Sequence, residues 1–295
     1  MSDVQAIIDT LRYLKRFQGT TILIKLGGSI LHDETRIKAL CDDLALLRSA
    51  GIKLVLVHGG SKAINQALDT YGIESTFVDG LRVTTKEAMT VIEMVLSGHV
   101  NTMLVRKLNH IGINAIGLSG ADSKLLACER LSEEHGQVGS VVNINTKPIV
   151  SVLAQQQRES DAIPVIAPIG IDERGEALNI NADWAATHIA VALGVDKLIF
   201  LTDQTGIKNK TNEVLSVLSE DNLLGLIADG TVRDGMLTKV KAILFALNND
   251  LNHIHIINGQ KPHALIEELF TVNGIGTLCQ KGKVKAHEPQ EEFSE

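Results

Sequence analysis

Residues 21–29 read Thr-Ile-Leu-Ile-Lys-Leu-Gly-Gly-Ser, and this stretch decides the fold. The apolar run 21–24 predicts a buried strand, and Lys25 with the pair Gly27-Gly28 leads the chain into a turn. Glycine has no Cβ, so its backbone N–H groups can approach an anion closely. The stretch therefore indicates a strand that carries a cation to an anion-binding turn. The alternative is an ordinary β-turn beside a surface lysine.

A second glycine turn follows the next expected strand. Residues 36–50 have helical apolar spacing, residues 53–57 are β-branched and apolar, and His58-Gly59-Gly60-Ser61 follows before a helix over 62–70. Strands separated by helices predict a parallel sheet, whose ligands bind at the carboxyl ends of the strands. We therefore expect both glycine turns at one edge of one sheet.

The rest of the chain continues the alternation of helices and strands. We expect helices over 86–111 (interrupted near Gly98), 183–193, 236–248 and 262–271, strands over 114–118, 197–202 and 253–257, and a β-hairpin elaboration at the sheet edge within 127–178. His253 and His255 alternate along a strand, and we interpret them as structural.

Composition narrows the class of protein. The chain of 295 residues is 44% hydrophobic and 21% charged, which is ordinary for a globular protein. Its formal net charge of −7 argues against general nucleic-acid binding, although a few focused cations can still bind an anionic substrate. No apolar stretch approaches a membrane span and the N-terminus does not resemble a signal peptide, so we expect a cytoplasmic protein with no membrane partner.

Several common types of site are missing from the sequence. Cys41, Cys128 and Cys279 lie far apart with no Cys/His ligand spacing, which predicts reduced thiols and no structural zinc or other protein-bound metal. Walker A, GxGxxG, GxSxG and HExxH motifs do not occur. Any phosphate site must therefore be built another way.

Two polar clusters at helix starts offer that alternative. Asn179-Ile-Asn-Ala-Asp183 and Asp234-Gly-Met-Leu-Thr-Lys239 each open an expected helix, whose free N–H groups and partial positive charge favour phosphate. Asp183 has a second interpretation as a plain helix N-cap.

These motifs together resemble the amino acid kinase family, and within it the N-acetylglutamate kinases. The resemblance runs from Thr21 to about Leu278, over nearly the whole chain. The matching segments are IKLGGS (24–29), VHGGS (57–61), GLRVT (80–84), VIEMVLSG (91–98) with Asn101, GLSGAD (117–122), LNINADWAA (178–186), LTDQTGI (201–207) and GMLTK (235–239).

The resemblance implies an α/β fold: a three-layer αβα sandwich with an open, mainly parallel central sheet. It also implies ATP-dependent phosphorylation of the γ-carboxylate of N-acetyl-L-glutamate in arginine biosynthesis, with Mg²⁺ on the ATP. The implied site residues are Lys25, Lys239 and Asp183 for catalysis; Gly60, Ser61, Arg82 and Asn179 for the acyl amino acid; Gly27, Gly28, Gly59 and Gly235 for phosphate; and Thr202, Asp203, Gly206 and Met236 for the nucleotide.

The implied chemistry suits these residues. A γ-carboxylate is ionised at neutral pH and needs no general base, so the difficulty is that one anion must attack another.

Two features depart from the family pattern: Ser61 replaces the third glycine of an HGGG turn, and Asp234 stands where glycine commonly precedes Gly235-Met236. Both bear on catalytic efficiency rather than on the fold.

The resemblance also implies an organisation and a regulator. Residues 1–19 form an expected amphipathic helix that packs on its own domain or, as we expect, on another subunit of a homo-oligomer, a dimer or hexamer. Residues 20–178 would bind the acyl amino acid, residues 179–282 would bind ATP, and 283–295 would be a flexible tail. A segment similar to the arginine site of inhibited, hexameric members supplies the residues His263, Glu268, Gly274 and Gly276; the alternative is a plain terminal helix.

Two other functions remain open from the residues alone. Arg82 and Asn179 cannot distinguish acyl groups on the α-nitrogen, so the acid could be of the aminoadipate or glutamate type. A non-catalytic regulatory subunit with the same fold, binding arginine or a partner protein, is the alternative from a different class. Retention of Lys25, Asp183 and Lys239 argues against it.

Overall fold

The computed structural model describes residues 15, 17–78, 80–154, 162–271 and 274–282. An eight-stranded sheet forms its centre, in the order β12-β14-β13-β11-β1-β2-β8-β5. Pairing is parallel throughout except between β13 and β14. The strands are β1 (Thr21–Leu26), β2 (Lys53–His58), β5 (Ala115–Ser119), β8 (Ile163–Ala167), β11 (Lys197–Thr202), β12 (Val217–Ser219), β13 (Ile254–Asn258) and β14 (Thr277–Gln280). The expected open, mainly parallel sheet is confirmed.

The alternation of side chains along β1 decides where its lysine goes. Ile22, Ile24 and Leu26 belong to the hydrophobic core on one face of the sheet, and Leu23 belongs to the core on the other. Successive side chains of a strand point to opposite faces, so Lys25 shares the face of Leu23. Helices cover that face of the sheet, and Lys25 can reach the N-terminal turns of those helices.

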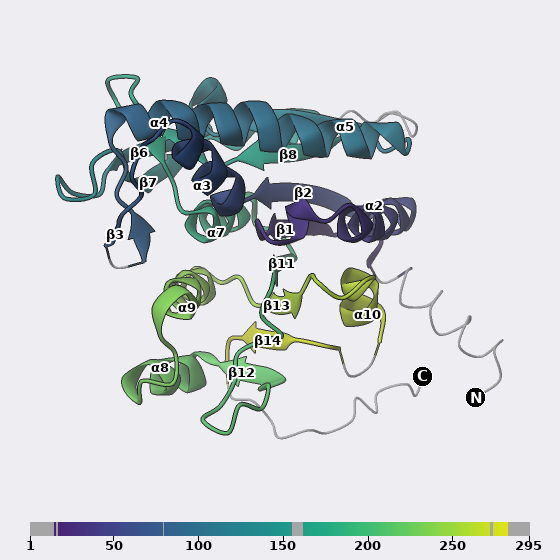
Figure 1. Ribbon diagram of the computed structural model, residues 1–295. Helices are drawn as coiled ribbons and strands as arrows, with labels where there is room; N and C mark the ends of the chain where they lie inside the picture. The colour runs from purple at the N-terminus through teal and green to yellow at the C-terminus, as the bar shows by residue number, and fades with distance from the viewer. Residues whose placement is uncertain (1–14, 16, 79, 155–161, 272–273, 283–295) are drawn as a thin grey trace, which may run out of the picture.

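Helices form a layer on each face of the sheet (Figure 1). Helices that contribute to the core on the face of Ile22 are α2 (Glu34–Ser49), α3 (Ser61–Thr70), α4 (Lys86–Glu93), α5 (Thr102–His110) and α10 (Ala264–Phe270). Helices that contribute to the core on the face of Leu23 are α6 (Lys147–Leu153), α7 (Ala182–Leu193), α8 (Glu220–Ala228) and α9 (Asp234–Asn248). These are the three layers that the family resemblance implies.

The expected interruption near Gly98 is present as a change of helix type rather than as a break in the helix. A π-helical segment, Met94–Asn101, joins α4 to α5 without a break, and Gly98 lies inside it. The resulting helix over residues 86–110 is the one helix in the described part of the chain that is long and apolar enough to cross a membrane. Half of its most apolar window is buried inside the protein, as in the core helix of a globular domain.

The section 127–178 differs in part from the expected edge hairpin. Strands β6 (Leu126–Arg130) and β7 (Gly139–Ile144) do form an antiparallel pair, in a second sheet with β9 (Ile169–Ile171) and β10 (Ala177–Asn179). Strand β8, however, lies within the central sheet between β2 and β5. Sequence patterning does not indicate helix α6, helix α8 or strands β12 and β14. All four are short, so they carry little periodic signal.

Three smaller elements complete the description of the fold. They are the 3-10 turns Ile30–His32 and Asp122–Lys124 and the hairpin of β3 (Phe77–Val78) with β4 (Leu81–Arg82). The expected N-terminal helix over 1–19 falls almost wholly outside the described residues, as does the expected tail over 283–295.

Candidate active site at the carboxyl edge of the sheet

One carboxylate and two lysines meet beside the carboxyl end of β1. Lys25 Nζ lies 2.8 Å from Asp183 Oδ1, and Lys239 Nζ lies 2.7 Å from Asp183 Oδ2. Lys25 comes from β1, Asp183 from the first turn of α7 and Lys239 from the second turn of α9. The structure thus brings together the three residues expected to be catalytic.

The cluster is buried and carries excess positive charge. The side chains of Lys25, Asp183 and Lys239 are between 7% and 12% exposed. Burial alone would raise the pKa of Asp183, but the two lysines outweigh it and hold that pKa well below its usual range. Burial lowers the pKa of Lys239, and the neighbouring Lys25 adds to this while Asp183 opposes it. With one negative and two positive charges, the cluster suits a further anion.

The start of α7 explains why Asp183 is free to take this role. The N-cap is Asn181, whose side-chain oxygen accepts from the N–H groups of Asp183 (2.9 Å) and Trp184 (3.2 Å). The alternative interpretation of Asp183 as the cap is therefore wrong. Aromatic contacts fix α7 against α9, with the rings of His188 and Phe245 centred 4.5 Å apart.

Some N–H groups of the two glycine turns form hydrogen bonds to the sheet, and others remain available to a ligand. Gly27 N donates to Leu201 O at 2.8 Å and Gly59 N donates to Leu26 O at 2.9 Å. These two glycines, expected to bind phosphate, therefore use their N–H groups to extend the sheet.

Three other N–H groups at these turns stay open. Those of Gly28, Gly60 and Ser61 donate to no protein group within the described residues. Ser61 has no positive φ, so its N–H is presented much as that of a glycine would be. Replacing the third glycine by Ser61 therefore leaves the backbone donor in place.

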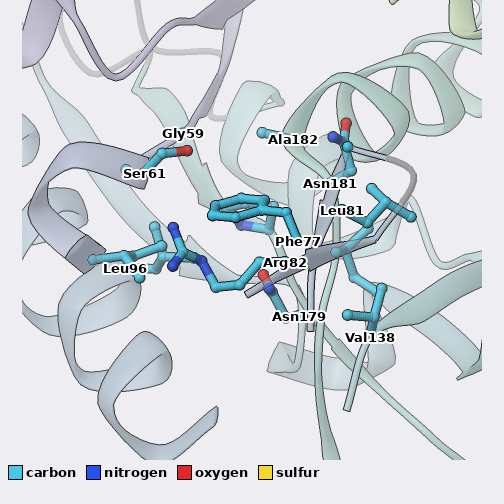
Figure 2. A pocket seen from close by; sticks show the side chains of 15 residues that line it. Gly59, Ser61, Phe77, Leu81, Arg82, Leu96, Val138, Asn179, Asn181 and Ala182 are labelled. Atoms are coloured by element: carbon cyan, nitrogen blue, oxygen red, sulfur yellow. The ribbon is translucent and has the colours of Figure 1, made fainter. Parts of the chain in front are cut away.

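A cavity opens beside the second glycine turn, and Arg82 reaches into it (Figure 2). Its lining includes the expected substrate residues Gly60, Ser61, Arg82 and Asn179. Arg82 is 7% exposed, and its guanidinium lies 4.7 Å from the centre of the Phe77 ring and donates to the neutral side chains of Ser75 and Asn65. No carboxylate of the described residues forms an ion pair with Arg82. A buried guanidinium that forms no ion pair within the described residues has the charge and the planar donors to bind a carboxylate.

The hydroxyl of Thr84 ties two of these substrate residues together. It donates to Arg82 O at 3.0 Å and accepts from Asn179 Nδ2 at 3.1 Å. Reasoning from the sequence misses Thr84 and the stacked Phe77 as individual site residues. Both lie within or close to the segment GLRVT, and that proximity is the signal that could have found them.

The expected nucleotide residues lie around the end of β11 and the start of α9. Thr202 ends β11 and its hydroxyl lies 3.2 Å from Asp203 Oδ1. Gly206 has φ +146°, and a Cβ there would fall 2.6 Å from Thr277 Oγ1, so the loop after β11 can approach β14 only with glycine. Gly235 and Met236 lie in the first turn of α9.

Asp234 has a backbone conformation that glycine would adopt more readily. Its φ is +49°, in the left-handed region where a side chain costs about 1–2 kcal/mol. The acid therefore adds both local strain and a negative charge at the helix start.

Three of the four expected arginine residues lie together at α10 and the loop that follows it. Glu268 Oε1 lies 2.7 Å from His255 Nδ1, and Glu268 Oε2 accepts from Ile275 N (2.7 Å) and Gly276 N (3.1 Å). A Cβ at Gly274 would fall 2.8 Å from the same Glu268 oxygen. In this structure the Glu268 carboxylate is thus occupied by groups of its own chain.

The fourth expected arginine residue, His263, has a different partner. Its Nδ1 lies 2.7 Å from Asp43 Oδ1, a carboxylate on α2. His263 therefore joins the start of α10 to α2 rather than to Glu268.

Comparison with known proteins identifies relatives over almost the whole chain. The model of the amino acid kinase family matches residues 20–258. An acetylglutamate kinase of Campylobacter curvus is 44% identical over 277 residues, covering 94% of this chain and 97% of the relative. An acetylglutamate kinase of Campylobacter hominis is 41% identical over 278 residues, covering 94% of this chain and 96% of the relative.

The fold is also similar to that of solved structures with lower sequence identity. N-acetylglutamate synthase from Neisseria gonorrhoeae, complexed with coenzyme A and N-acetyl-glutamate, matches with a TM-score of 0.84 at 23% identity. The match covers 96% of this chain and 65% of that chain.

Proposed function

The chain belongs to the amino acid kinase family, and on this premise we propose that it transfers the γ-phosphoryl group of ATP to the side-chain carboxylate of N-acetyl-L-glutamate. The observation that carries the proposal is the Lys25–Asp183–Lys239 cluster beside a cavity lined by Arg82, which forms no ion pair with a carboxylate of the described residues. The product is an acyl phosphate of arginine biosynthesis. A place in the cytoplasm is part of the same proposal.

Binding of the acid uses the two ends of the cavity. Arg82 binds the α-carboxylate, and Asn179 donates to or accepts from the acylated amino group. This leaves the γ-carboxylate directed toward the open N–H groups of Gly60 and Ser61. The carboxylate is ionised at neutral pH, so it attacks without a general base.

Transfer itself depends on electrostatic stabilisation. Charge in the transition state spreads over the equatorial oxygens of the phosphoryl group. Lys25 and Lys239 neutralise it from positions that Asp183 fixes in advance, at 2.8 and 2.7 Å, so that little reorganisation is needed. Gly28 supplies a further N–H, and the first turn of α9 at Gly235 faces the phosphates.

Mg²⁺ fits this arrangement as an ion carried by the nucleotide. The described residues contain no group of three or more His, Cys, Asp or Glu side chains that could hold a metal. Magnesium commonly binds through substrate phosphates and water with few protein ligands. Bound there, it neutralises part of the phosphate charge.

The test is ATP-dependent hydroxamate formation with N-acetylglutamate, glutamate and N-acetylaminoadipate in parallel. We expect turnover with N-acetylglutamate far above the other two acids. Preference for another acid would shift the substrate assignment, and absence of turnover with all three despite ATP binding would favour a regulatory subunit. Lys25→Ala with full activity would contradict the mechanism.

Regulation by arginine is a separate part of the proposal. The segment from His263 to Gly276 supports a site in which Glu268 pairs with an arginine ligand after releasing its internal hydrogen bonds. We expect arginine to inhibit the enzyme and Glu268→Ala to lose that inhibition. Unchanged sensitivity in Glu268→Ala would exclude this residue.

Assembly into a homo-oligomer, a dimer or hexamer, is a further part of the proposal. Residues 1–19 of one subunit would pack against another, with residues 20–178 and 179–282 as the acid-binding and ATP-binding parts. The apolar spacing of residues 4–17 supports this role for the first segment. Light scattering of the full chain, with and without residues 1–19, tests it.

A further inference from the structure

Behind the second glycine turn lies a buried polar pair that the proposed mechanism does not use. His58 is 0% exposed and Asn101 is 5% exposed. His58 Nδ1 lies 3.0 Å from Gly59 O, and His58 Nε2 lies 3.2 Å from Asn101 Nδ2. Burying polar groups is costly unless their hydrogen bonds are all made.

The geometry fixes which ring nitrogen carries the proton. A carbonyl oxygen can only accept, so Nδ1–H donates to Gly59 O. Nε2 then has a lone pair and accepts from the Asn101 amide at 3.2 Å. The second N–H of that amide donates to Val165 O at 2.8 Å, and Leu118 O is a more distant neighbour of the same nitrogen at 3.5 Å. Both ring nitrogens are satisfied only in the neutral ring. Complete burial lowers the pKa of His58 to about 4 and so favours that form.

The π-helical segment is what brings Asn101 to this place. Five-residue hydrogen-bond spacing inserts one extra residue, which turns the following side chains by about 100° relative to a regular α-helix. Leu96 and Val100 of the same segment pack against the glycine turn: a Cβ on Gly60 would fall 2.5 Å from Leu96 Cδ2 and 3.6 Å from Val100 Cγ2. A Cβ on Gly117 would fall 2.1 Å from Asn101 Oδ1, so the amide has its space only beside glycine.

Peptide planarity connects this pair to the site. In a trans peptide the carbonyl of one residue and the N–H of the next point in opposite directions. Holding Gly59 O toward the buried ring therefore directs the Gly60 N–H away from it. Gly60 lines the cavity, and its N–H has no acceptor among the described residues.

We propose that Asn101 and His58 are positioning residues for phosphoryl transfer. Together they hold the Gly59 carbonyl inward and so aim the Gly60 N–H at an anionic oxygen in the cavity. The inference rests on the proposed function for the identity of that anion, but the tautomer that it requires is independent of any activity.

The first test is spectroscopic and uses the full chain. Nitrogen-15 NMR of histidine-labelled protein at neutral pH should show His58 protonated at Nδ1 and unprotonated at Nε2, with the signal assigned by its loss in His58→Gln. A ring protonated at Nε2 would overturn the proposal, whether or not the protein phosphorylates N-acetylglutamate.

The second test separates positioning from stability. Asn101→Leu should lower kcat about tenfold and change the KM for either substrate by less than about threefold, because the Gly60 N–H no longer holds the attacking γ-carboxylate in its reactive position. Asn109→Leu is the matched control, since Asn109 on α5 bonds the backbone of Ala115 at 2.8 and 3.3 Å without touching His58. It should lower the melting temperature but leave kcat unchanged. Wild-type activity with unchanged kcat in Asn101→Leu overturns the positioning role, whereas an inactive wild type contradicts the proposed function instead.

A third variant covers the case in which Asn101→Leu does not fold. Asn101→Asp keeps the shape but presents an acceptor to Nε2, which favours the proton there and removes the donor to Gly59. Protonating the ring restores that donor. The kcat of Asn101→Asp relative to wild type should therefore rise as the pH falls from about 8 to about 6, on either side of the ordinary histidine pKa. A constant ratio contradicts the proposal.

Discussion

At the scale of single residues, burying the charges of the Lys25–Asp183–Lys239 cluster costs free energy. That cost is offset only while all three charged groups are present. Two ammonium groups are held within 2.8 Å of one buried carboxylate. Each charge lost its hydration on folding, and each is compensated by the others. Removing the shared carboxylate leaves two cations facing each other in a buried site.

Asp183→Asn is therefore expected to impair stability and catalysis together. We predict a fall of about 3 kcal/mol in the free energy of unfolding, measured by urea denaturation, because an uncompensated buried charge is left behind. We also predict a loss of at least about 100-fold in kcat, because both lysines lose their fixed position. Asp42→Asn, on the exposed side of α2, is the control and should change neither. An unaffected kcat in Asp183→Asn would contradict the assigned role.

Arg82 is expected to act on binding alone. A lysine keeps the charge at this position but loses the planar pair of donors that matches a carboxylate. Arg82→Lys should raise the KM for N-acetylglutamate about 10- to 100-fold and leave the KM for ATP within about twofold. Arg130→Lys, at an exposed position of β6, serves as the control. An equal rise in both KM values would indicate a general structural effect instead.

At the scale of elements, the expected interruption of the helix over 86–110 takes a form that the sequence does not indicate. Glycine at 98 predicts an interruption, and the structure has a π-helical segment there instead of a break. Gly98 is exposed, and a Cβ added there would meet no atom within 4 Å apart from its chain neighbours and the backbone of its own helix. Its neighbours Leu96, Val100 and Asn101 instead shape the glycine turn after β2. The π-helical segment therefore affects the site by determining which of its side chains face the glycine turn.

Gly98→Ala tests this description of the element. Alanine in an exposed helix interior is better than glycine by about 0.5–1 kcal/mol, so the variant should be more stable by that amount in urea denaturation. Gly72→Ala is the contrasting variant, because its φ of +67° is unfavourable for any side chain. It should be less stable than wild type. Destabilisation by Gly98→Ala would mean that the helix is broken there.

At the scale of the whole molecule, buried histidines contribute to the dependence of stability on pH. Burial lowers the pKa of His58 to about 4, and burial also lowers the pKa values of His188 and His255. In the unfolded chain each has a pKa of about 6.5. Between the folded and unfolded values the unfolded state binds more protons, so stability rises with pH and is lost as the pH falls.

We therefore predict that the free energy of unfolding decreases as the pH falls from about 6.5 to about 4. His58 contributes a few kcal/mol to this loss, on the order expected for a group whose pKa is about 4 in the folded protein and about 6.5 in the unfolded chain. The lowered pKa of Asp183 contributes little to the slope in this window, since most of its contribution is lost only as the pH falls below the unfolded pKa of about 3.9. Urea denaturation across this range measures the slope, and His58→Gln should flatten it. A slope unchanged in that variant would contradict the assignment to His58.

Local sequence signals account for most of the sheet and for the main helices. The apolar run before Lys25, the β-branched run before His58 and the polar starts of α7 and α9 are signals that act over a few residues. They predict the parallel core and both glycine turns. Short or non-periodic elements are not predicted, because they carry little periodic signal. The central position of β8 is not predicted either, because strand order depends on contacts between segments far apart in the chain.

The sequence by itself determined which groups are available: two lysines, an acid, a set of glycines and one arginine. Tertiary structure decided how each is used. Lys25 meets Asp183 and Lys239 because β1 alternates its side chains and α7 and α9 pack on that face. The glycine turns after β1 and β2 give some of their N–H groups to the sheet and keep the others open. The reason is physical: residue type fixes hydrogen-bonding capacity, but which partner takes it up depends on residues brought together only when the sheet forms.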